Sequence, residues 1–317
     1  MSSKLDFALA VLNGAVGDYL ARTGNGLATE MTWVRGGRSY RLDREALARE
    51  LPAARPRLAI LVHGLMCTET VWRAPDGSDY GALLDRDFGF EPLHVRYNTG
   101  LAVAENGARL ATMLEALVDA YPVPVEEILL LGYSMGGLVV RSACHVAGLE
   151  GQRWLPLARR AIYVGTPHLG APLERVGRTV AKALRAVGDP YARLIAELGD
   201  LRSDGVKDLG DADLRHEDRA RPAGFGLRDA RHPVPLLPSM RHYLVAGALW
   251  RDPWLAGLFG DAVVSLASAT DGAYRSRETT AFPPGHVAIV QGLDHVNLPR
   301  CPEVYEQIRA WCSEEVS

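Results

Sequence analysis

The chain has 317 residues and a formal net charge of −3, with 48% hydrophobic and 23% charged residues. This composition is typical of a folded globular protein and excludes a disordered, collagen-like or disulfide-stapled chain. The sequence has no basic excess that would bind nucleic acid, and none of its apolar runs reaches the about 18 residues that a membrane span needs.

The N-terminal segment 1–30 is expected to form an amphipathic helix. Its apolar residues recur at helical spacing, which places them on one face that can pack on the rest of the protein. We expect the helix to be retained and the protein to be cytoplasmic. The alternative is that the uncharged stretch 7–17 belongs to the signal peptide of a periplasmic or secreted protein. The residues of the apolar face are Leu5, Leu9, Leu12, Val16 and Leu20.

Segments 31–170 and 241–317 are expected to form one α/β core. A hairpin at 31–42, with a Gly36–Gly37 turn, precedes six short apolar runs, most of which do not alternate with polar residues. Continuous apolar runs are typical of parallel strands covered on both faces. Helical patterns separate them, which predicts a doubly wound, mostly parallel sheet. The strand runs are 58–64, 91–97, 128–134, 161–166, 242–248 and 286–292, and the helical stretches are 102–120, 137–146 and 302–311.

Segment 171–240 interrupts the alternation and is expected to form a cap insertion. It has no convincing strand, but it carries two helical apolar faces, at 173–187 and 191–198. Its later part, 200–231, is dense in charge and glycine, which predicts an irregular segment. Because the insertion follows the carboxyl end of a predicted strand, we expect it to cover the edge of the sheet where ligands bind in such folds.

A candidate nucleophile lies at Ser134, in the sequence Gly-Tyr-Ser-Met-Gly that begins at Gly132. This is a G-x-S-x-G pattern between a predicted buried strand and a predicted helix. A strand that turns directly into a helix strains the serine backbone and leaves little space, so Gly132 and Gly136 supply clearance. The N–H of Met135, at the start of the helix, would then face the reacting carbonyl oxygen.

A second backbone donor is expected after the first inner strand, in Val62-His63-Gly64-Leu65. Acyl-transfer sites need two N–H groups that face the developing oxyanion, and the second comes from the loop after such a strand. Leu65 is in that place. We interpret His63 as a buried histidine that bonds to loop backbone, not as a proton-transfer group.

These segments resemble the lipase and esterase branch of the α/β-hydrolase superfamily, in particular the bacterial lipases and the relatives of the GPI inositol deacylase. The segment 164–171 (VGTPHLGA) adds to the resemblance, and 203–209 is a weaker match to a cap segment. The similarity runs from about residue 56 to about residue 312. It implies an α/β-hydrolase fold with a cap, and a triad in the chain order serine, acid, histidine.

This order selects the base. His295 lies in Gly-Leu-Asp-His-Val-Asn after the last predicted strand and resembles the histidine loop of bacterial lipases. His286 begins that strand, at the wrong end of the sheet. The other candidates precede the required position: His168, His216, His232 and His242.

The resemblance also suggests the acid. Asp261 matches the Asp-Gly-x-Val loop of the lipases, although Ala262 stands where that family usually has glycine. Asp252 and Asp271 are rival candidates. Asp294 adjoins His295, which gives poor geometry toward the neighbouring ring.

The sequence therefore predicts a serine ester hydrolase. Ser134 would attack, His295 would act as base, Asp261 would orient it, and the N–H groups of Leu65 and Met135 would bind the oxyanion. We expect a small-molecule ester with an apolar acyl chain and no cofactor or metal. The alternatives are an acyltransferase with the same triad and a catalytically silent ligand-binding protein. The charged segment 211–218 is predicted to be a solvated loop and not a metal site. The four cysteines are predicted to be free thiols: Cys67, Cys144, Cys301 and Cys312.

Overall fold

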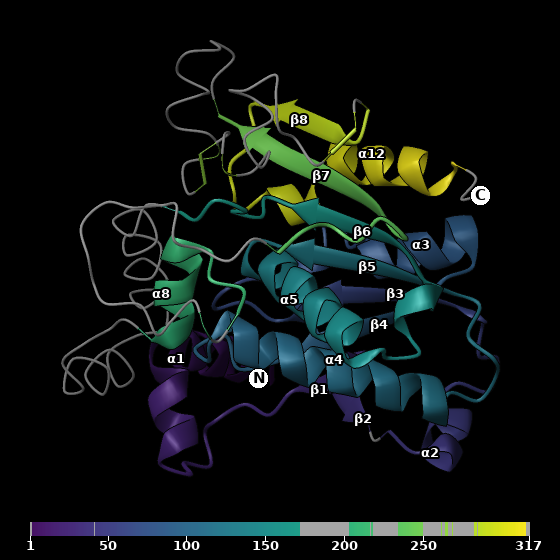
Figure 1. Cartoon of the computed structure of the whole chain (residues 1–317), viewed down its shortest axis with the longest axis horizontal. Coiled ribbons are helices and arrows are strands. Elements are labelled where there is room, and N and C mark those ends of the chain that lie inside the picture. Colours follow the sequence, from purple (N-terminus) through teal and green to yellow (C-terminus); the bar gives the residue numbers. More distant parts are fainter. Residues whose placement is uncertain are drawn as a thin grey trace.

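A mixed eight-stranded sheet in the order β2-β1-β4-β3-β5-β6-β7-β8 forms the centre of the molecule (Figure 1). The computed structural model describes residues 2–40, 42–171, 203–215, 217, 234–249, 261, 264, 265, 268, 282, 283 and 285–314. Strands β3 to β8 pair in parallel, whereas β1 pairs antiparallel with β2 and β4. The strands are β1 Thr32–Arg35, β2 Arg38–Tyr40, β3 Arg57–Val62, β4 Glu91–Arg96, β5 Glu127–Tyr133, β6 Ala158–Val164, β7 Arg241–Ala248 and β8 Val287–Gln291.

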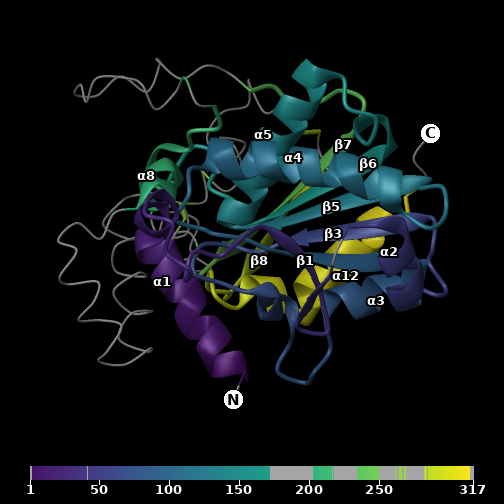
Figure 2. The same cartoon turned by 90° about the horizontal axis from the view of Figure 1, so that it is seen from below.

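Helices cover both faces of the sheet, as the doubly wound prediction requires. Figure 2 shows α4 and α5 on one face and α3 and α12 on the other. Each layer belongs to its own buried apolar cluster. The bounds are α1 Ser2–Arg22, α2 Arg44–Glu50, α3 Tyr80–Phe88, α4 Val103–Ala120, α5 Met135–Glu150, α8 Asp204–Asp211 and α12 Pro302–Cys312, with short 3₁₀ turns at Glu69–Trp72, Leu155–Leu157 and Leu298–Arg300.

The continuous apolar strands divide their side chains between the two clusters. In β3, Leu58 and Ile60 join the α4–α5 side while Ala59 and Leu61 join the α3–α12 side. All four are fully buried. Alternate side chains of a strand point to opposite faces, so a strand covered on both sides must be apolar throughout. The prediction of a parallel, doubly covered sheet is confirmed.

The observed elements differ from the predicted ones in three places. Outside the expected cap, two helices were not predicted, α2 and α3. Helix α5 begins at Met135, directly after Ser134, two residues earlier than expected. The edge strand β8 is only half covered, and its Ile289 is 41% exposed.

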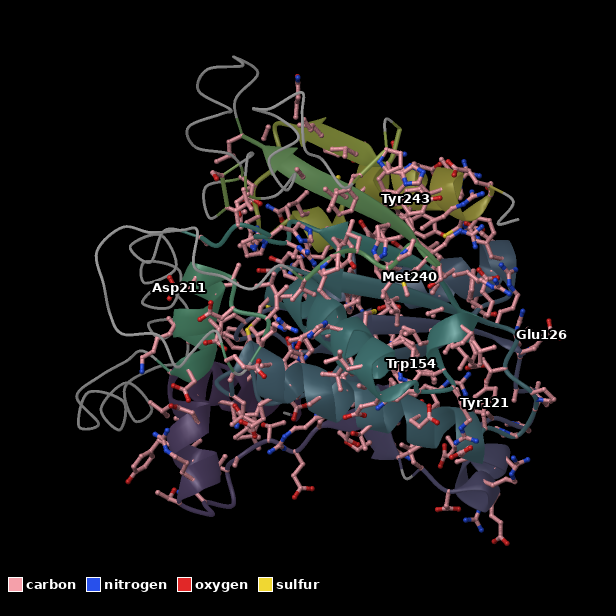
Figure 3. The ribbon with its side chains drawn as sticks, in the orientation of Figure 1. Tyr121, Glu126, Trp154, Asp211, Met240 and Tyr243 are labelled. Atoms are coloured by element: carbon pink, nitrogen blue, oxygen red, sulfur yellow. The ribbon has the colours of Figure 1, made fainter. Side chains whose placement is uncertain are left out.

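Helices α1 and α8 lie together beyond the carboxyl ends of the parallel strands (Figure 1). Figure 3 places Asp211, the last residue of α8, on the side opposite Glu126, which precedes β5. Helix α1 places Leu12, Val16 and Leu20 in the main cluster, whereas Leu5 is 61% exposed, so the expected apolar face is wrong at that residue. The helix is kinked at Val16, where φ is −142° and ψ is 20°.

The expected cap is described only in part. The apolar faces at 173–187 and 191–198 lie outside the described residues. Within 200–231, the expectation of an irregular segment is wrong for the residues around α8, because Ser203 caps that helix and Val206 and Leu209 are buried.

The four cysteines are free thiols, three of them buried and Cys67 half-buried. Burial raises the pKa of Cys67, Cys144 and Cys312 to about 12, which keeps these thiols protonated and unreactive at neutral pH. Among the described helices, none has both the length and the apolarity that crossing a membrane requires.

Candidate active site

Ser134 lies in a strained turn between β5 and α5. Its φ of 53° and ψ of −124° are outside the regions that a serine normally adopts. Close approaches explain the glycines around it. A Cβ on Gly132 would lie 2.6 Å from Gly137 Cα, and one on Gly136 would lie 2.3 Å from the Val62 carbonyl oxygen. The Ser134 N–H donates to the Val164 carbonyl at 2.8 Å, which ties the turn to β6.

Three of the predicted site residues form one chain of hydrogen bonds. His295 Nε2 lies 2.9 Å from Ser134 Oγ, and His295 Nδ1 lies 2.6 Å from Asp261 Oδ2. A carboxylate only accepts, so Nδ1 carries the proton and Nε2 is free to accept from the serine hydroxyl. All three residues are buried. The chain of contacts has the geometry of a nucleophile, a base and an orienting acid.

Asp261 is held by the backbone of its own loop. Its Oδ1 accepts the Val264 N–H at 2.8 Å, and its carbonyl accepts the His295 N–H at 3.0 Å. The rival carboxylates Asp252 and Asp271 lie outside the described residues. Asp294 turns to Asn297 instead, accepting from its backbone and side-chain nitrogens.

The surroundings of His295 include residues that the sequence analysis did not assign. The Tyr133 hydroxyl donates to the His295 carbonyl at 2.9 Å. Gly165, with φ of 59°, sits against the ring: a Cβ there would lie 3.2 Å from His295 Cε1. On the acid side, a Cβ on Gly247 would lie 3.0 Å from Asp261 Cβ. Gly165 belongs to the segment 164–171, whose resemblance to lipases was the only sequence feature that pointed to this residue.

The loop after β3 brings Gly64, the residue before Leu65, against Ser134. A Cβ on Gly64 would lie 3.0 Å from Ser134 Cβ. The Gly64 carbonyl accepts from Cys67 N–H at 3.2 Å and from His63 Nδ1 at 2.9 Å. Because a trans peptide points its N–H opposite to its C=O, the Leu65 N–H is directed away from these two donors. Within the described part of the chain, neither this N–H nor that of Met135 has an acceptor.

His63 matches its interpretation as a buried histidine. It is 1% exposed and stacks on Tyr97 at 4.6 Å between ring centroids. Burial lowers the pKa of His63 to about 4, so the ring is neutral at pH 7. Its Nδ1–H donates to the Gly64 carbonyl. The pKa of His242 is likewise lowered to about 4 by burial, and burial holds the pKa of His168 well below its ordinary value.

Because these buried histidines are neutral, we expect the folded protein to lose stability in mild acid. Below a pH of about 6.5 the unfolded chain binds protons that the buried rings do not, so each ring stabilises the fold above that pH and loses its contribution as pH falls toward 4. We expect the free energy of unfolding to fall by up to about 1.4 kcal/mol per pH unit for each ring. Urea unfolding between pH 7.5 and 4.5 measures the slope; a flat profile would contradict it.

A metal centre finds no support in the described residues, since no group of three or more histidine, cysteine, aspartate or glutamate side chains there could hold an ion. Of the charged segment 211–218, Asp213 is buried at 8% exposure, so the prediction of a fully solvated loop is wrong at that residue.

No protein-family model matches this chain, and no curated relative matches it. Among solved structures it is similar to a Bacillus licheniformis lipase in mature form, with 18% identity over 77% of this chain and 86% of that one and a TM-score of 0.46. It is also similar to a Pyrococcus furiosus esterase, with 12% identity, 83% of each chain and a TM-score of 0.47. A third is an alpha/beta hydrolase fold protein from Chitinophaga pinensis, with 12% identity, 83% of this chain, 91% of that one and a TM-score of 0.45.

The sheet is mostly parallel and covered by helices on both faces. The serine stands on a sharp turn between a central strand and a helix, and the acid and the histidine follow it in that chain order. This arrangement is that of the α/β-hydrolase fold.

Proposed function

We propose that this protein is a serine hydrolase that cleaves carboxylic esters, as lipases and esterases do. The single observation that carries the proposal is the hydrogen-bonded chain from Ser134 Oγ through His295 to Asp261. A catalytically silent binding protein has no need to keep a strained serine, a correctly protonated imidazole and a buried carboxylate aligned. The two backbone N–H groups beside the serine supply the remaining requirement of acyl transfer.

The proposed reaction follows from the protons in this chain. Ser134 Oγ attacks the ester carbonyl carbon while His295 Nε2 takes its proton, and Asp261 stabilises the imidazolium. The carbonyl oxygen becomes an oxyanion that the N–H groups of Leu65 and Met135 bind. His295 then protonates the leaving alcohol. Water, activated by the same imidazole, releases the acid from the acyl-serine and restores the free enzyme.

A fluorophosphonate probe tests this proposal directly. The probe phosphonylates an activated serine with loss of fluoride, so the folded protein should be labelled stoichiometrically at Ser134, as located by peptide mass spectrometry. Acid-unfolded protein serves as the control and should not react. Absence of label in folded protein would overturn the proposed function. Adding an alcohol during turnover of a p-nitrophenyl ester then separates hydrolysis from transfer to an acceptor.

We further propose that the ester carries an apolar acyl chain, on the support of the apolar helical pattern at 173–187. Each buried methylene adds about 0.8 kcal/mol, so longer chains should gain from an apolar cap. Replacing Val180 and Leu184 by serine should lower kcat/KM for octanoyl esters by roughly tenfold or more, while acetyl esters change little. Equal losses for both chain lengths would contradict an acyl-chain role for this segment.

A further inference from the structure

The loop that carries Leu65 has an unusual backbone. Residues Gly64 to Cys67 form a β-turn closed by the Cys67 N–H and the Gly64 carbonyl at 3.2 Å. Met66, the third residue of the turn, has φ of 57°. Positive φ at this position is the type II pattern, which normally requires glycine. In the described residues, only Met66, Ser134 and Ala212 adopt positive φ without being glycine. A methionine stays there only if its surroundings hold it.

Two neighbours hold Met66. Its N–H donates to Thr99 Oγ1 at 3.1 Å, and Thr99 is 1% exposed. Its side chain lies against Gly14 of helix α1, where a Cβ would come within 2.3 Å of Met66 Cγ. In a type I turn the peptide between Leu65 and Met66 is flipped, which would turn the Met66 N–H away from the threonine. Thr99 therefore selects the type II form, and Gly14 provides the space that this form needs.

The loop that carries Thr99 is itself held by close contacts with helices α1 and α8. Its carbonyl oxygen would lie 2.1 Å from a Cβ on Gly205, at the start of α8. On the other side, the neighbouring Asn98 donates to the Gly17 carbonyl of α1 at 2.9 Å. Ser203, the N-cap of α8, donates to the Gly14 carbonyl at 2.7 Å. Helices α1 and α8 thus clamp the loop that presents Thr99 to Met66.

We infer that Thr99 and Gly14 are positioning residues for the oxyanion donor: they hold Met66 in the left-handed conformation and so keep this strained turn closed, and the closed turn holds the Gly64–Leu65 peptide, which carries the Leu65 N–H, in its place next to Ser134. The inference depends on the proposed function. It gives α1 a task in the reaction, although α1 contributes none of the triad side chains or proposed oxyanion donors. Because an oxyanion donor acts in the transition state, its misplacement lowers kcat and leaves KM nearly unchanged.

The test compares two changes at one position. Thr99→Ser keeps the hydroxyl that accepts from Met66, whereas Thr99→Val keeps the shape and removes the oxygen. With p-nitrophenyl butyrate, Thr99→Val should lower kcat by about 10- to 100-fold with KM within about twofold, because small misplacements at a reacting centre have effects of this size. Thr99→Ser should stay within about threefold of wild type.

A second readout separates positioning from loss of stability. An alkyl trifluoromethyl ketone adds to Ser134 Oγ, its carbonyl oxygen becomes the oxyanion, and the serine proton passes to His295. Its inhibition constant should rise in Thr99→Val by the same factor as kcat/KM falls. The matched control is Ser142→Ala on helix α5. This change removes a buried hydroxyl that donates to the Leu214 carbonyl at 2.9 Å. It should lower the melting temperature and leave kcat/KM and the inhibition constant unchanged.

The outcomes are distinct. If wild type neither turns over esters nor takes the fluorophosphonate, the proposed function fails and this inference fails with it. If wild type is active and Thr99→Val keeps its kcat and its affinity for the trifluoromethyl ketone, only the positioning role is overturned. Should Thr99→Val not fold, Thr99→Ala removes the same oxygen from a smaller side chain and is judged by the same two constants.

Discussion

Replacing Ser134 by alanine is expected to lower ester turnover by on the order of a millionfold, the cost of losing the nucleophile of such a triad. The change removes one oxygen from a buried turn, and the remaining backbone contacts of the turn are unchanged. The measurement is hydrolysis of p-nitrophenyl butyrate at saturating substrate, with the fold checked by circular dichroism.

Ser142→Ala is a suitable control for this change, because Ser142 lies on α5 and its hydroxyl bonds to the Leu214 carbonyl. It should retain activity close to that of wild type. Activity of Ser134→Ala within about tenfold of wild type would exclude the proposed mechanism, since an enzyme that keeps most of its rate does not use that hydroxyl as nucleophile.

Asp261→Asn is expected to lower kcat by about ten-thousandfold. An asparagine amide that donates to Nδ1 forces the imidazole proton onto Nε2, and the ring then cannot accept the proton of Ser134. Fluorophosphonate labelling should slow by a similar factor, because it needs the same activated serine. Substrate binding should change little.

The rival carboxylates provide the comparison. Asp252→Asn and Asp271→Asn should retain kcat within about threefold, because in the proposed mechanism neither carboxylate orients His295. If Asp271→Asn is the damaging change and Asp261→Asn is not, another carboxylate orients the base, and the contact at 2.6 Å between Asp261 and His295 is not the productive one.

Strands β3, β5, β6 and β7 could be predicted because coverage on both faces forces a continuous run of apolar residues. A strand such as β5 must be apolar at every position when its alternate side chains enter two different clusters. Helix α3 was missed although its ends are marked, with Asp79 accepting from the Gly81 and Ala82 N–H groups and Gly89 ending the helix at φ of 71°. Only nine residues lie between them, too few to show a convincing period.

The candidate site also has residues that could be predicted from the sequence and residues that could not. The serine turn was predictable because its glycines are neighbours of Ser134 in the chain, and Asp261 and His295 were chosen as candidate acid and base from chain order and family resemblance. The roles of Gly165, Gly247 and Thr99 could not be predicted, because each depends on a contact with a residue far away in sequence. A Cβ on Gly165, for example, meets the ring of His295. Such contacts exist only after the strands have aligned.

The contact between α1 and α8 also affects how the chain folds during its synthesis. The hydrogen bond from Ser203 to Gly14 joins residues 189 positions apart, so α1 leaves the ribosome long before its partner does. At synthesis rates of about 5–20 residues per second, that delay is on the order of ten to forty seconds. In the first part of this delay, Val11, Leu12 and Leu20 lack most of the apolar cluster in which they end up, because that cluster is built largely from residues 33–171. The nascent segment of helix α1 is therefore one that chaperones would be expected to bind.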